Sequence, residues 1–213
     1  MKTTSIALLL MLSSFFTLKA QNENHKPAQI SWGLKAEANY SGFLVSGTSI
    51  IESKVKPGGT FGGFFHVELS EYFALQGELQ FHYKSSRMDR DGMKGDFRYW
   101  GMEIPAYIMY QKKFRNKTRL YTGVGPNAEF GFAAKLKRGT EKINPYEKDK
   151  STDISAMKDS GAGFGFILGY EFVNGIQINT GYKISVTNIL DANSSSFTLR
   201  PHSFNIGIGY HFH

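Results

Sequence analysis

The amino-acid sequence predicts an all-β protein: an eight-stranded antiparallel up-and-down transmembrane β-barrel preceded by a cleaved signal peptide. Three observations lead to this prediction. The chain begins with an export signal, eight segments alternate apolar and polar residues with the period of a β-strand, and the connections between these segments alternate between long and short. Polarity spread evenly through such segments fits strands in which every second residue faces lipid.

The first 20 residues have the build of a secretory signal peptide. Lys2 lies in a short charged head, an apolar run extends from Ile6 to Leu18, and Ala20 precedes Gln21 as the small residue of a cleavage point. The apolar run is too short for a membrane-spanning helix, which takes roughly 20 residues. We therefore predict that the chain is exported and cleaved between Ala20 and Gln21.

Three ranges follow from this cleavage point. Residues 1–20 are the signal peptide, residues 21–29 are a polar periplasmic lead-in, and residues 30–213 are the barrel domain. The chain has no cysteine, which excludes a disulfide framework and thiol chemistry. Loss of Lys2 and Lys19 leaves 23 basic residues against 18 acidic ones, and both kinds are interspersed. Because the sequence shows no basic stripe and no recognised nucleic-acid-binding motif, we expect no nucleic acid among its partners.

The first four predicted strands cover residues 30–40, 60–69, 73–83 and 100–110. In the first, apolar residues at the even positions alternate with polar or small residues over eleven positions. The second and third form a hairpin around a tight turn near Ser70 and Glu71, which places His66 opposite Gln76. The fourth contains Pro105, which cannot donate to a ladder, so we expect a β-bulge there.

The last four predicted strands cover residues 119–132, 161–172, 176–184 and 204–212. The fifth sets apolar residues against Arg119 and Glu129, and the sixth sets aromatic residues against glycines. Asn174 and Gly175 form a strong tight-turn signal between the sixth and the seventh. In the eighth, the alternation continues to Phe212.

The alternating connection lengths are typical of an outer-membrane barrel with short periplasmic turns and longer external loops. This arrangement predicts that the protein lies in the cell outer membrane with both mature termini in the periplasm. The predicted outer loops cover residues 41–58, 84–96, 135–159 and 187–198. We expect other envelope or secretion proteins to bind these loops.

The composition of the two strand faces favours a membrane barrel over a soluble one. Glycines gather on the polar face, where a narrow barrel interior needs small residues beside large ones. Aromatic residues lie near the ends of the apolar bands, as in an interfacial girdle: Trp32, Tyr40, Tyr83, Trp100, Tyr110, Tyr170 and Tyr210. The apolar face is therefore predicted to face lipid.

Eight strands leave room only for side chains in the interior, so we predict a network of paired polar residues and no open pore. The predicted interior network consists of Lys35, Glu37, His66, Glu68, Glu78, His82, Glu103, Arg119, Glu129, Glu171 and Lys183. A narrow gated path for protons or ions through this network is the alternative.

No catalytic, cofactor-binding or metal site is predicted. His66 and His82 share the inner face, but the hairpin register keeps them apart. A lipid-modifying barrel enzyme is the other alternative, and it needs a serine with a histidine base near the outer rim. Ser203 beside His202 is the one such adjacency, and neighbouring strand residues point to opposite faces. We therefore predict a protein that is not an enzyme and has no cofactor.

Several segments resemble the PorT-like outer-membrane barrel family, which is common in Bacteroidetes. They are residues 103–110, 120–126, 163–169, 175–182 and 187–189, and the cleavage region around Ala20 also looks like the signal peptides of that group. The chain departs from a usual barrel end, because Phe212 is followed by His213.

The resemblance implies an outer-membrane barrel, and one member of the family is associated with type IX secretion. It suggests an envelope scaffold or interaction protein that is accessory to protein secretion. The expected partners are outer-membrane lipid or lipopolysaccharide, the barrel-assembly machinery, and other envelope or secretion proteins.

Overall fold

The structure is a computed structural model, and it describes residues 29–48, 50–90, 93–138, 141–147, 157–190 and 197–212. The predicted signal peptide, its cleavage point at Ala20 and Gln21, and almost all of the lead-in lie outside the described residues. The division into three ranges therefore stays a prediction. Within the part of the chain that the structure describes, no helix is long and apolar enough to cross a membrane.

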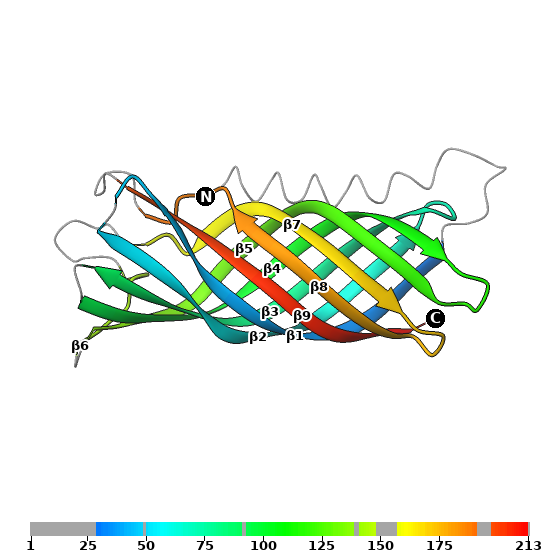
Figure 1. Cartoon of the computed structure of the whole chain (residues 1–213), viewed down its shortest axis with the longest axis horizontal. Helices are drawn as coiled ribbons and strands as arrows, with labels where there is room; N and C mark the ends of the chain where they lie inside the picture. The colour runs from blue at the N-terminus through cyan, green and yellow to red at the C-terminus, as the bar shows by residue number, and fades with distance from the viewer. Residues whose placement is uncertain are drawn as a thin grey trace.

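The described chain is built of strands. They are β1 (Gln29–Ser46), β2 (Ile51–Glu68), β3 (Phe73–Arg90), β4 (Met93–Lys113), β5 (Arg119–Arg138), β6 (Glu141–Ile143), β7 (Ser160–Glu171), β8 (Ile176–Ser185) and β9 (Thr198–Phe212). Each long strand pairs antiparallel with its neighbour in sequence, and the pairing of β1 with β9 closes the ring. The strands run obliquely around a long barrel (Figure 1). Eight strands form the ring and short β6 pairs with β5 outside it, so the predicted eight-stranded antiparallel up-and-down barrel is confirmed.

The short turns gather at one end of the barrel, where β1 begins and β9 ends (Figure 1). His66 pairs with Gln76 in the β2–β3 hairpin, as the sequence predicts. In the β7–β8 turn, Gly175 has a φ of 82°, which glycine adopts without strain. The amide of Phe172 donates to the carbonyl of Ile176 over 2.8 Å and completes this turn.

The bulge predicted at Pro105 is wrong. Pro105 pairs with Asn127 in a register that is the same on both sides of the proline. The shift in the β4–β5 ladder lies instead at Trp100 and Gly101, where β5 carries one extra residue. A proline only removes one donor from a ladder, which leaves a gap in the hydrogen bonding without changing the register.

The outer loops predicted at residues 41–58 and 84–96 are also wrong. The strands β1 and β2 extend into the first range up to Ser46 and from Ile51, and β3 and β4 extend through most of the second. Charged and small residues in these ranges resemble a loop, but backbone pairing does not depend on side-chain polarity. Beyond the lipid the outward face of a strand contacts water, so its residues no longer need to be apolar.

The two remaining predicted loops are partly correct. In residues 135–159, the first four belong to β5, and residues 141–143 form β6. In residues 187–198, only Thr198 belongs to a named strand, and Met157 forms an isolated bridge with Leu190. Residues 139–140, 148–156 and 191–196 lie outside the described residues.

The apolar face points outward along the barrel. Phe65 is 67% exposed and Ile108 is 63% exposed, whereas inward-facing His66 and Glu103 are fully buried. This is the arrangement of a barrel in lipid, because a soluble barrel would bury its large apolar side chains. The inward glycines make room for large neighbours: a Cβ at Gly33 would collide with the ring of Phe64.

Candidate functional site in the barrel interior

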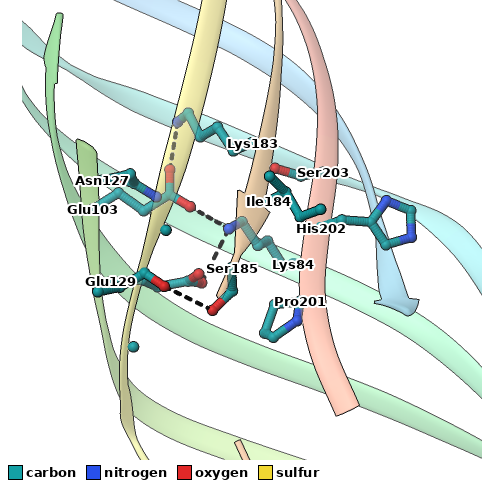
Figure 2. Close-up of a pocket in the computed structure, with 13 residues that line it drawn as sticks. Lys84, Glu103, Asn127, Glu129, Lys183, Ile184, Ser185, Pro201, His202 and Ser203 are labelled. Atoms are coloured by element: carbon teal, nitrogen blue, oxygen red, sulfur yellow. Dashed lines mark hydrogen bonds and ion pairs between the residues drawn. The ribbon is translucent and has the colours of Figure 1, made fainter. Parts of the chain in front are cut away.

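A buried carboxylate connects two sides of the lumen. Glu103 on β4 accepts hydrogen bonds from Lys84 on β3 and from Lys183 on β8. Lys183 also donates to the amide oxygen of Gln80 over 2.6 Å. Figure 2 shows Glu103 between the two lysines. Because β8 and β3 are not neighbours in the sheet, this bridge fixes strands on different sides of the barrel.

The same cluster extends to Glu129 on β5. Lys84 donates to Glu129 over 3.0 Å, and the hydroxyl of Tyr99 donates to it over 2.9 Å. Two lysines therefore face two carboxylates, and the charges balance. Such balance is needed because a buried charge without a partner is costly.

A second cluster is centred on Lys35 on β1. Its ammonium lies 2.9 Å from Glu37 and 2.9 Å from Glu78. Gln76 and Gln80 donate to the two oxygens of Glu78 over 2.7 and 2.6 Å. The amides thus satisfy lone pairs that the lysine does not reach, as a buried ion pair requires.

A third cluster lies towards the end with the short turns. Arg119 on β5 donates to Glu171 on β7, to Nε2 of His66 over 2.7 Å and to Gln111 over 2.8 Å. A guanidinium can only donate, so Nε2 of His66 is the acceptor. His211 on β9 lies 2.9 Å from the same oxygen of Glu171 and joins the last strand to the cluster.

The structure places all eleven residues of the predicted network on the inner face. Ten of them belong to the three clusters or contact them, including His82, whose Nε2 lies 3.2 Å from Glu129. Glu68 is at the rim, where it pairs with partly exposed Lys113 over 2.7 Å.

Sequence reasoning missed several members of the clusters, most clearly Lys84. The range 84–96 was expected to be a loop, but the even positions of β3 up to His82 already point inward, and Lys84 continues that series. The alternation of polar residues along β3 was therefore the sequence signal that could have identified Lys84 as an interior residue. The prediction also left out Tyr99, Gln111 and His211. Tyr99 and Gln111 carry no charge, and His211 lies at the end of the last strand, so the search for charged interior residues did not select them.

The interior also brings together three groups that could ligate a metal ion. Ligand atoms of His82, Glu103 and Glu129 lie within 4.8 Å of one another. Lys84 already donates to both carboxylates and supplies the positive charge at this point. The histidine pairs weighed from the sequence were His66 with His82, which belong to different clusters, and His211 with His213, of which His213 lies outside the described residues.

Ser203 and His202 do not form a nucleophile and base. Ser203 is 1% exposed and faces the lumen. The ring of His202 points away from the lumen (Figure 2), and its Nδ1 lies 3.3 Å from the hydroxyl of Tyr182 on the outer face. The wall of the barrel separates the two side chains, so the histidine cannot take a proton from this serine.

The end of the lumen opposite the short turns, which we call the outer end, is filled by an apolar core. Its buried members are Phe43, Phe97, Tyr99, Ala134, Met157, Ile189 and Leu199. The rings of Phe43 and Phe97 pack edge to face with centroids 5.3 Å apart. The core combines side chains of β1, β4, β5 and β9 with side chains from two connecting segments.

Backbone hydrogen bonds hold those connecting segments across the mouth of the barrel. The amide of Lys158 donates to Ile189 over 2.7 Å, and the amide of Ile189 donates to Leu199 over 3.0 Å. Gly131 on β5 donates to Asp159 over 2.6 Å. The described parts of these segments at residues 157–159 and 189 are therefore part of the folded end of the barrel.

Comparisons with known proteins agree with this architecture. Residues 7–212 match the model of the family described as outer membrane protein beta-barrel domain. The solved structure of the outer membrane protein OprG from Pseudomonas aeruginosa is similar at 14% identity, with 87% of this chain and 97% of that chain covered and a TM-score of 0.53. Neisserial surface protein A is similar at 13% identity, with 86% and 99% covered and a TM-score of 0.50. These likenesses show the fold. No curated protein sequence gave a significant match.

Proposed function

Because the chain belongs to the outer membrane protein beta-barrel domain family, and is therefore an outer-membrane barrel, we propose that it is a non-enzymatic barrel with a closed lumen that acts as an envelope scaffold or interaction protein. The observation that carries this proposal is the double closure of the lumen. Charged clusters fill the middle, and the apolar core fills the outer end. A path for solutes would have to break both.

The charged clusters support a structural role more than a conducting one. Glu103 is shared by two lysines that come from different sides of the barrel, and Glu78 is held by a lysine and two amides. Side chains that satisfy one another in this way resist rearrangement, because each lost contact leaves a buried charge. The narrow gated channel needs such a rearrangement and also a passage through the apolar core.

The proposed orientation has both mature termini in the periplasm. It is supported by the short turns, which share one end of the barrel with the start of β1 and the end of β9 (Figure 1). Outer-membrane barrels have their short turns on the periplasmic side. In this orientation the apolar core and its connecting segments face the cell exterior, where an interacting protein would bind.

A PorT-like identity and an accessory role in secretion are finer proposals that rest on the sequence segments named above. A deletion strain tests the role directly. We expect a lower amount of secreted cargo proteins in the culture medium, measured by mass spectrometry and restored by a plasmid copy. Unchanged secretion in the deletion strain would remove the secretory role and leave the scaffold role in place.

Permeability of vesicles tests the closed lumen, and lipid analysis tests the enzyme alternative. Purified barrel in liposomes should give no faster efflux of a small anionic dye than empty liposomes. Overexpression of the wild type and of Ser203→Ala should give identical lipid A mass spectra. A new lipid A species that appears with the wild type and disappears with Ser203→Ala contradicts the non-enzymatic proposal.

A further inference from the structure

The outward surface of β2 to β5 becomes basic beyond the aromatic residues that end the lipid-facing band. Tyr83 on β3 and Trp100 on β4 are register partners with ring centroids 4.9 Å apart. On β4, the next outward residue towards the outer end is Arg98, which pairs with Lys135 on β5. A step of two residues along a strand covers about 7 Å, so Arg98 begins close to the edge of the aromatic girdle.

One step further, four outward residues form a continuous row across four strands. Lys54 pairs with Arg87, Arg87 with Asp96, and Asp96 with Lys137. Lys56 reaches the same row, since its ammonium lies 2.6 Å from the carboxylate of Asp96. We call the following six cations the basic face: Lys54, Lys56, Arg87, Arg98, Lys135 and Lys137.

Asp96 is the acid within these rows, and it holds two of the cations in place. Lys56 and Nε of Arg87 both bind its Oδ1, over 2.6 and 3.1 Å. The hydrogen bond from Lys56 lowers the pKa of Asp96, which keeps the carboxylate charged. One acid against six cations leaves the basic face with a large excess of positive charge. The row beyond it, with Glu52, Asp89 and Lys94, marks its outer limit.

The other half of the barrel carries fewer cations at this end among the described residues. Among the described exposed residues at the same end of β7, β8, β9 and β1 are Lys158, Asp159, Ser160, Val186, Arg200 and Leu44, so two cations and one acid stand there. A rim that only needed water-soluble side chains would carry charge all round. The concentration of six cations on four adjacent strands indicates a surface for an anionic partner.

We propose that the basic face binds the phosphate groups of lipopolysaccharide in the outer leaflet. The basic face lies next to the aromatic girdle, which is the level of lipid head groups. The guanidinium of an arginine can bind a phosphate through two parallel hydrogen bonds, and the ammonium of a lysine adds a compact positive charge. Arg87 keeps its terminal nitrogens available because Asp96 takes only its Nε. Asp96 acts as a positioning residue that keeps Lys56 and Arg87 side by side.

Binding in detergent tests this proposal. The probes are purified lipopolysaccharide and the same material after removal of its phosphates, and the variant is Arg87→Gln with Arg98→Gln and Lys135→Gln. Because each cation near an anionic lipid surface contributes roughly 1 kcal/mol, the triple variant should bind about 100-fold more weakly. The wild type should prefer the phosphorylated probe, and added salt should weaken its binding. Arg200→Gln, on the other half of the barrel, is the matched control and should bind like the wild type.

Three results would overturn the proposal. In the first, the wild type binds both probes with equal affinity. In the second, the triple variant migrates as a folded barrel on unboiled gels and binds with wild-type affinity. In the third, the triple variant and Arg200→Gln lose the same amount of affinity. Preferential binding of an acidic protein over the phosphorylated probe would assign the surface to a protein partner instead.

The proposal rests on the proposed orientation, which is tested separately. Since the natural chain has no cysteine, Lys135→Cys gives a single thiol on the basic face. A membrane-impermeant maleimide should label it on intact cells, and Asn174→Cys in the β7–β8 turn should stay unlabelled. Labelling of Asn174→Cys alone would contradict the orientation while leaving phosphate binding in detergent unaffected.

Discussion

The middle of the lumen and its outer end use opposite side chains for the same task of filling a narrow barrel. In the middle, β4 directs Glu103 inward and Ile108 outward, so the inside is polar and the outside apolar. At the outer end, the same strand directs Phe97 inward and Arg98 outward, so the polarity is reversed. The reversal occurs near Trp100, where the lipid-facing band ends. Lipid requires an apolar outer face only along its own thickness, and beyond it the strands can build an apolar core like that of a soluble barrel.

The largest expected effect comes from breaking the ion pairs in the middle of the lumen. Glu103→Ala leaves Lys84 and Lys183 without their shared carboxylate. Removal of one partner from a buried ion pair costs about 3 to 5 kcal/mol, so the free energy of unfolding should fall by that amount. Urea titration of the barrel in lipid vesicles measures it. A loss below about 1 kcal/mol would mean that the lysines find other partners.

The apolar core should respond less strongly, and to a different kind of change. Phe97→Ala removes a fully buried ring and leaves a cavity, which should lower the free energy of unfolding by about 3 kcal/mol. Phe97→Leu should recover most of this loss, because packing and not charge is involved. The same urea titration applies. If Phe97→Leu proved as harmful as Phe97→Ala, the outer end would not behave as a packed core.

The rim provides the reference for an ion pair in water. Lys113 is 44% exposed in its pair with Glu68. Exposed ion pairs contribute about 0 to 1 kcal/mol, so Glu68→Ala should change the free energy of unfolding by less than about 1 kcal/mol. A loss as large as that of Glu103→Ala would remove the distinction between the middle of the lumen and its rim.

The smallest effect is expected at Asp96, outside the lipid-facing band. Its carboxylate has a lowered pKa through the hydrogen bond from Lys56, so it stabilises the folded barrel when it is charged. This contribution is present above the unfolded pKa of about 3.9 and is lost as the pH falls through the lower folded pKa. Asp96→Asn should therefore unfold more easily than the wild type at pH 6, by less than about 1 kcal/mol, and equally easily at strongly acidic pH. A difference between the two proteins that persisted in strong acid would have another cause.

The sequence alone was enough to predict the ring of strands and the faces of the lipid-facing band. Alternation from Ile30 to Tyr40 and the turn at Asn174 and Gly175 depend on local chemistry, which one sequence displays. The pairing of His66 with Gln76 was predicted from the tight turn near Ser70 and Glu71, and it is confirmed.

The outer end was not predicted, for a physical reason. Phe97 and Arg98 lie in a charged, glycine-containing stretch whose alternation is the reverse of the expected one, so the stretch resembled a loop. The partners of Phe97 come from distant parts of the chain, such as Phe43 and Leu199, and no local pattern shows that they meet. Likewise, Lys84 and Lys183 are brought together by Glu103 only after the ring closes.

Single-channel recording in planar lipid bilayers tests the closed lumen most directly. The wild-type barrel, inserted in 1 M KCl with the applied voltage stepped in both directions, should give no discrete conductance steps above the bare bilayer. Insertion is verified afterwards by recovery of the folded protein from the membrane. Regular, voltage-independent conductance steps from the verified wild-type barrel would contradict the closed lumen and favour a channel through the charged clusters.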